Sequence, residues 1–113
     1  MRHRMLGIGI ATAAALMAGA PSTAAAEPLS PSAQRGLVFV RTNCAQCHAI
    51  GREGASPLAI APPFRTLHKK YPVESLAEAF AEGIVTGHPS MPEFRLEPDR
   101  INAVISYLKT LER

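Results

Sequence analysis

The chain has 113 residues, of which 47% are hydrophobic and 19% charged, and its formal net charge is +3. This length is enough for one small domain and too short to bury a large core unaided. Arg2 and Arg4 supply two of the twelve basic residues, so the chain after residue 26 carries ten Lys or Arg against nine Asp or Glu, a net charge of +1. A charge so close to zero gives no reason to expect nucleic acid or a strongly anionic partner.

Residues 1–26 have the three parts of a secretory signal: a basic start, an apolar stretch over residues 5–20, and a small-residue end at Ala26. The apolar stretch is shorter than the roughly 18 residues of a membrane-spanning helix and is interrupted by glycines. No paired arginine precedes it, which favours general secretion. We therefore predict a cleaved signal over 1–26, a mature domain over 27–113, no stable membrane span and a periplasmic location.

The first predicted helix follows a short tail. Ser30 can cap it with Pro31 in its first position, and it would run to about Asn43. Directly after it, residues 44–48 read Cys-Ala-Gln-Cys-His. On one helical turn the two thiols can reach the two vinyl groups of one haem, and the imidazole that follows can bind the iron. This C-x-x-C-H motif therefore predicts one covalent haem c.

In that interpretation Cys44 and Cys47 attach the haem and His48 is the proximal iron ligand. A redox dithiol of the thioredoxin type is an alternative, but it needs strands that alternate with helices. A zinc site would need four ligands, and no second paired motif is present. A disulfide between residues three apart is geometrically awkward. The histidine that follows the second cysteine favours haem, whose attachment outside the cytoplasm agrees with the predicted signal.

The rest of the chain predicts loops and two further helices, with no strand-like alternation. Residues 49–70 contain three prolines and two glycines, a composition typical of an irregular loop. A helix opens at Pro72 and stops at Gly83. The last helix starts near Pro98, and its apolar side chains recur at helical spacing at Ile101, Val104, Ile105 and Leu108. We predict an all-α fold of three to four helices, in which a buried haem supplies the apolar centre.

Met91 is the candidate for the sixth iron ligand. No other methionine follows residue 26, and Met91 lies in a proline-rich segment that would hold a thioether stiffly. His88 and His68 are the alternatives, because a second imidazole would give a bis-His haem of lower potential. An iron without a stable sixth ligand would instead indicate a gas-binding or peroxidase-like protein.

These residues resemble the class I cytochromes c, small soluble monohaem proteins with His and Met axial ligands. That family has a Gly eight residues and an apolar residue four residues before the first Cys, and here these are Gly36 and Val40. Residues 104–109 resemble the family's C-terminal helix, whose aromatic residue packs near that glycine. The resemblance implies a cytochrome c-like fold, with crossing N- and C-terminal helices.

Residues 61–67 are similar to the family's Gly-Pro-x-Leu segment, in which the proline carbonyl accepts the N–H of the proximal histidine. The resemblance implies that Pro62 orients His48. The chain departs from the family in having no Trp and in having Ala61 in place of the glycine. The haem propionates would be contacted by Arg52, Arg65 or Tyr71, and the sequence does not choose among them.

The function that the resemblance implies is electron transfer, with the iron cycling between Fe(II) and Fe(III), and the chain is not expected to be an enzyme by itself. Its partners would be redox proteins: a periplasmic dehydrogenase or quinol-oxidising complex as donor, and a terminal oxidase or reductase as acceptor. The alternative is a cytochrome subunit of a dedicated dehydrogenase complex.

Overall fold

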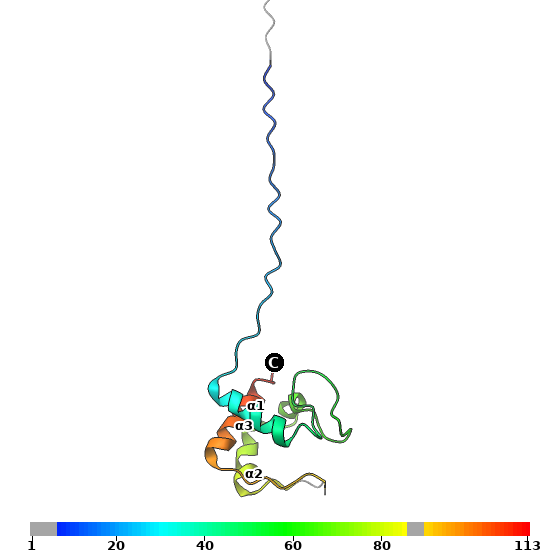
Figure 1. Ribbon diagram of the computed structural model, residues 1–113, viewed down its shortest axis with the longest axis vertical. Helices are drawn as coiled ribbons and strands as arrows, with labels where there is room; N and C mark the ends of the chain where they lie inside the picture. Colours follow the sequence, from blue (N-terminus) through cyan, green and yellow to red (C-terminus); the bar gives the residue numbers. More distant parts are fainter. Residues whose placement is uncertain (1–6, 86–89) are drawn as a thin grey trace, which may run out of the picture.

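The computed structural model describes residues 7–85 and 90–113. Residues 7–30 have no regular secondary structure and extend away from the folded domain (Figure 1). No helix within the described ranges is long and apolar enough to cross a membrane. The cleavage of residues 1–26 stays a prediction.

The folded domain is helical. Its elements in chain order are α1 (Pro31–Asn43), the 3-10 helix η1 (Phe64–Lys69), the 3-10 helix η2 (Val73–Ser75), α2 (Leu76–Glu82) and α3 (Pro98–Lys109). The described part of the chain contains no strand, and an isolated antiparallel bridge joins Ile84 to Phe94. The predicted all-α fold is confirmed.

Local signals determine the start of α1. The Ser30 hydroxyl accepts a hydrogen bond from the backbone N–H of Ala33 at 3.1 Å, and Pro31 occupies the first turn, where its missing N–H costs nothing. The helix ends at Asn43 and Cys44 is its C-cap residue, so its last turn leads directly into the cysteine pair. Both predicted boundaries of this helix are confirmed.

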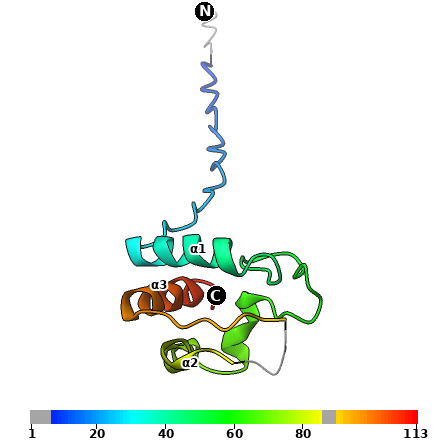
Figure 2. The ribbon, with the colours of Figure 1, turned by 60° about the horizontal axis from the view of Figure 1, so that its bottom comes forward.

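The helices α1 and α3 pack side by side (Figure 2). Their contact is closest at Gly36, where a Cβ atom would overlap the carbonyl oxygen of Ala103 and come within 2.8 Å of Tyr107 Cβ. The buried side of α3 carries Ile101, Val104 and other apolar residues at the predicted spacing. The aromatic residue of the last helix, Tyr107, therefore packs near Gly36, as the resemblance implied, while Val104 and Leu108 of the apolar stripe line the cavity described below.

The segment between the cysteine pair and α2 is more regular than predicted. Residues 49–70 were expected to form an irregular loop, but Phe64–Lys69 form η1. Pro63 sets an extended entry to this helix, and the Thr66 hydroxyl donates to the Pro63 carbonyl at 2.7 Å. A six-residue 3-10 helix has no apolar period long enough to be recognised in the sequence.

The helix predicted from Pro72 to Gly83 is present as two pieces, η2 and α2. Gly83 ends α2 with φ of 104°, a conformation that favours glycine. The chain then returns along α2, because the N–H of Ile84 donates to the Phe94 carbonyl at 3.0 Å and the N–H of Leu96 to the Phe80 carbonyl at 2.8 Å. These bonds fix the segment that follows Met91.

Candidate functional site

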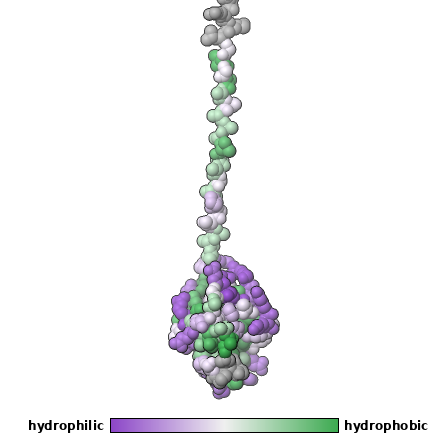
Figure 3. Space-filling view, turned by 90° about the vertical axis from the view of Figure 1, so that its right-hand side faces the viewer, coloured by the Kyte–Doolittle hydropathy of each residue, from purple (hydrophilic) through white to green (hydrophobic). Residues whose placement is uncertain are grey.

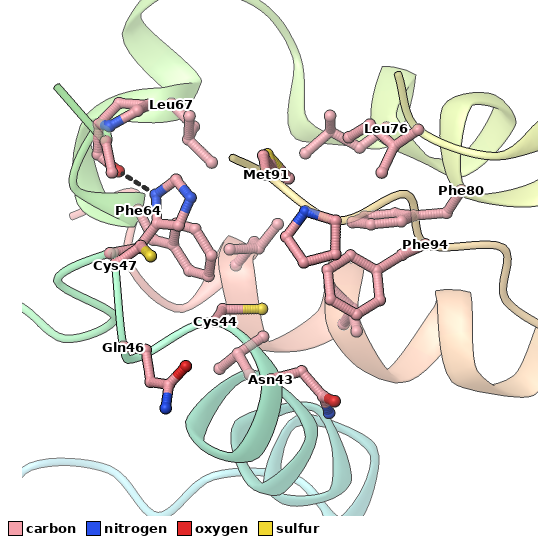
Figure 4. A pocket seen from close by; sticks show the side chains of 18 of the residues that line it. Asn43, Cys44, Gln46, Cys47, Phe64, Leu67, Leu76, Phe80, Met91 and Phe94 are labelled. Carbon is pink, nitrogen blue, oxygen red and sulfur yellow. Dashed lines mark hydrogen bonds between the residues drawn. The ribbon is translucent and has the colours of Figure 1, made fainter. Parts of the chain in front are cut away.

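A cavity of about 400 Å³ lies among α1, α2, α3 and η1. Most of its lining is apolar, and the chain's four phenylalanines all contribute to it: Phe39, Phe64, Phe80 and Phe94. Figure 4 shows the thiols of Cys44 and Cys47 and the side chain of Met91 around one central space. The cavity thus brings together residues that lie almost fifty positions apart in the sequence.

The cysteine pair continues the end of α1 as a turn. The backbone N–H of Cys44 donates to the Val40 carbonyl at 2.8 Å, and that of His48 donates to the Cys44 carbonyl at 2.9 Å. Both thiols are free and half-buried, and both line the cavity. The turn therefore presents the two sulfur atoms and the imidazole to the same space.

Burial raises the pKa of the Cys44 thiol to about 11. At neutral pH this thiol is therefore protonated and behaves as a small apolar group. A dithiol redox centre depends on the opposite effect, a lowered pKa that makes a reactive thiolate. The environment of Cys44 suits conversion to an apolar thioether better than it suits disulfide exchange.

A hydrogen bond to the backbone fixes the orientation of the His48 imidazole. Its Nδ1 atom lies 2.8 Å from the carbonyl oxygen of Pro62, the bond drawn as a dashed line in Figure 4. The carbonyl can only accept, so Nδ1 carries the proton and Nε2 keeps its lone pair for a metal. The ring of Phe64 lies against the imidazole, with centroids 4.9 Å apart. The Pro62 contact expected from the resemblance is present.

Backbone bonds attach the loop after the cysteine pair to that pair. The N–H of Leu58 donates to the Cys47 carbonyl at 3.1 Å, and the N–H of Phe64 donates to the Ala49 carbonyl at 2.9 Å. The N–H of Ala49 is in turn satisfied by the Ser56 hydroxyl at 2.9 Å. The carbonyl that orients His48 therefore belongs to a segment held on both sides.

Met91 lies on the cavity wall, in the segment between α2 and α3. Of the two alternative ligands, His88 lies outside the described residues. His68 lies in the last turn of η1 and is not among the described residues that line the cavity. Within the described ranges, no group of three or more His, Cys, Asp or Glu side chains could hold a metal ion.

The cavity opens at the surface near the loop that precedes η1. Leu58 and Ile60 line it and are 36% and 63% exposed. Figure 3 looks onto this side of the molecule and shows an apolar area bordered by hydrophilic side chains. A group bound in the cavity would therefore have one edge near solvent.

This set of residues fits a haem. The cavity is apolar enough for a porphyrin, two thiols at its wall match the two vinyl groups, and His48 offers a nitrogen whose tautomer is already set. Cys44, Cys47 and His48 would hold the group on one side and Met91 on the other. The carbonyl of Pro62 would raise the basicity of the imidazole.

The comparison with protein families agrees with this fit. The model of the family described as "Cytochrome c" matches residues 33–112. No curated protein and no solved structure matches the chain. A match over this much of the chain shows the family: the chain belongs to the cytochrome c family, whose members are haem-based electron carriers.

Sequence reasoning did not identify the whole cavity wall. It named Val104 and Leu108 only as apolar helix residues, and it assigned no role to Phe39 or Phe94. These two rings meet edge to face, with centroids 6.1 Å apart. The available signal was that phenylalanine is scarce in this chain, with one each in α1, η1, α2 and the segment after Met91.

Proposed function

We propose that this chain is a periplasmic electron carrier with one covalent haem c, in which His48 and Met91 are the axial ligands. The observation that carries the proposal is the cavity that gathers Cys44, Cys47, His48 and Met91 among the four phenylalanines. The iron supplies one-electron chemistry between Fe(II) and Fe(III). The chain's own residues hold the group, orient it and exclude water.

Attachment uses the two thiols. Cys44 and Cys47 would each hold the haem through a thioether bond to one vinyl group, with the thiol hydrogen passing to the other vinyl carbon. The pKa of Cys44, raised by burial, keeps that hydrogen on sulfur at neutral pH. In the thioether form neither sulfur would ionise, so the half-buried site would carry no titrating thiol.

Axial ligation by Met91 is supported by its place on the wall and by the bonds that hold its segment. The Arg95 guanidinium donates to the Glu82 carbonyl at 2.8 Å, and this contact joins the segment to the end of α2. A thioether ligand favours the ferrous state and raises the reduction potential relative to two imidazoles. Such a carrier suits a donor such as a periplasmic dehydrogenase or quinol-oxidising complex and an acceptor such as a terminal oxidase or reductase.

Electron exchange would take place at the open side of the cavity. The exposed residues Leu58 and Ile60 allow a partner to approach the haem edge without any rearrangement of the fold. Because the chain needs only to keep both axial bonds, it contributes a rigid frame rather than a moving part.

The attachment is tested with three altered proteins expressed with a haem-attachment system. Cys44→Ala combined with Cys47→Ala should contain no haem after denaturing electrophoresis and haem staining, whereas Met91→Ala should keep it. Removal of residues 1–26 should also abolish attachment, because the chain would stay in the cytoplasm. Covalent haem in the double cysteine variant would refute the assignment, and covalent haem without residues 1–26 would refute the location.

A further inference from the structure

One charged atom in the described part of the chain is buried without a partner. The Nη1 atom of Arg65 is closed off from solvent and has no hydrogen-bond acceptor in the structure. Arg65 as a whole is half-buried, but an N–H group withdrawn from water without an acceptor loses its hydration and gains nothing in return. Its placement is therefore explained by an acceptor that is not part of the polypeptide.

Arg65 lies beside the haem cavity, between two residues that line it, and is not itself among the described lining residues. It belongs to η1, directly after Phe64, whose ring contacts His48, and two residues before Leu67, which lines the same cavity. Pro62, three residues earlier, orients the imidazole. Any movement of the segment that carries Arg65 is thus limited by its contacts with the proximal side of the site.

Three other side chains could bind a carboxylate of the haem, and each differs from Arg65 in its contacts or its exposure. Arg52 donates to the carbonyl of Thr110, which ties its guanidinium to the end of the chain. Tyr71 lines the cavity but is 38% exposed, so water can satisfy its hydroxyl. Arg100 lies over the ring of Phe39, 5.3 Å from its centroid. Among these, Arg65 has the buried and unpaired donor.

We propose that Arg65 binds a propionate carboxylate of the haem through its buried Nη1 atom, an inference that rests on the proposed function. A porphyrin of this kind brings two carboxylates, and a guanidinium is the side chain best matched to a carboxylate. The positive charge keeps the propionate ionised and offsets its negative charge near the iron. Arg65 is a positioning residue that also sets the reduction potential and its pH dependence.

The sign of the effect follows from the charges. Without Arg65, an uncompensated propionate stabilises Fe(III), so the midpoint potential falls. The pKa of the freed propionate rises because its cation is lost, and its protonation then favours Fe(II). The potential of such a variant should therefore increase as the pH is lowered through the neutral range, whereas that of the wild type should stay nearly flat.

The test is a redox titration of the haem-loaded protein from about pH 5 to pH 8, the range in which a freed propionate titrates. Arg65→Gln should keep covalent haem and the wild-type optical spectrum, but its midpoint potential should be lower and should depend on pH. The midpoint potential of Arg65→Lys should lie between those of the wild type and Arg65→Gln. Arg35→Gln is the matched control, because it removes the same charge from an exposed position on α1 and should leave the pH profile unchanged.

If the midpoint potential of Arg65→Gln varies with pH as that of the wild type does, the inference is overturned. A pH-dependent midpoint potential in Arg52→Gln alone would also overturn it. If Arg65→Gln does not fold, resonance Raman spectra decide: the propionate bending mode should differ between the wild type and Arg65→Lys, and identical modes would overturn the inference. Absence of covalent haem from the wild type would instead refute the proposed function, so the two failures are distinguishable.

Discussion

Single hydrogen bonds define the site at the scale of residues. The Pro62 carbonyl fixes the tautomer of His48, and the Ser56 hydroxyl satisfies the N–H of the neighbouring Ala49. Another such bond joins the last helix to this loop, because the Tyr107 hydroxyl donates to the Ile50 carbonyl at 2.6 Å. The proximal side of the cavity is thus held in place by α3 as well as by its own segment.

We expect Tyr107→Phe to lower the free energy of unfolding by about 1 kcal/mol, because the Ile50 carbonyl loses its donor while the ring stays in place. Tyr107 is 5% exposed, so water does not easily replace the hydroxyl. Denaturant titration of the haem-bound protein measures the difference. Equal stability of the two proteins would mean that this bond contributes nothing to the fold.

The difference in stability between the wild type and Tyr107→Phe should also depend on pH. Burial raises the pKa of Tyr107 above its ordinary value of about 10, so the neutral hydroxyl is favoured in the folded state. Its contribution is complete below the unfolded pKa and is lost as the pH rises through the folded pKa. The stability difference between wild type and Tyr107→Phe should therefore shrink above about pH 10. Tyr71 is present in both proteins, so its titration cancels.

The sequence predicted the residues of this site unevenly. Cys44, Cys47 and His48 are recognisable because one short motif carries the chemistry, and the Pro62 contact follows from the family resemblance. The proposed choice of Arg65 among three propionate candidates could not be made from the sequence, because it depends on which side chain has a polar atom that the fold buries without an acceptor. Burial of a single atom has no signature in the sequence.

The helices obey local rules at the scale of elements. The starts of α1 and α3 could be predicted because Pro31 and Pro98 each occupy a first turn, and the end of α2 because Gly83 takes a positive φ. The 3-10 helix η1 could not be predicted, because its six residues depend on the backbone bond from Phe64 to Ala49. Tertiary contacts, and not local propensity, decide that segment.

The crossing of α1 and α3 predicts a strong effect of a single methyl group. Gly36→Ala should lower the free energy of unfolding by about 3 kcal/mol, because the new Cβ atom meets the Ala103 backbone, which cannot move aside like a side chain. Thermal or denaturant unfolding of the haem-bound protein measures it. Gly51→Ala is the matched control, since a Cβ atom there has nothing within 4 Å. Equal stability of the two variants would contradict the close contact at Gly36.

At the scale of the whole molecule, the stability of the fold depends on how the haem cavity is filled. A cavity of about 400 Å³ is large for a chain of this length. Because the cavity opens to solvent on one side, its apolar walls would contact water if no haem filled it, and such contact destabilises the folded state. The sequence could indicate that a haem completes the core, but not which four aromatic rings would converge on it.

The double variant Cys44→Ala with Cys47→Ala should therefore lose more than haem attachment. Without a bound haem the cavity walls must either collapse or admit water, and we expect no cooperative thermal transition in circular dichroism. The matched control is Met91→Ala, which should keep the haem and a cooperative transition. A haem-free variant that unfolds as sharply as the haem-bound protein would show that the fold does not depend on the group in its cavity.

The most direct test of the account is the optical spectrum of the exported protein, oxidised and reduced and recorded into the near infrared. A methionine bound to ferric haem gives a weak band in that region. We predict low-spin covalent haem with this band in the wild type and its loss in Met91→Ala. Covalent haem without the band, or an unchanged band in Met91→Ala, would contradict axial ligation by Met91 and favour a bis-His or open iron site.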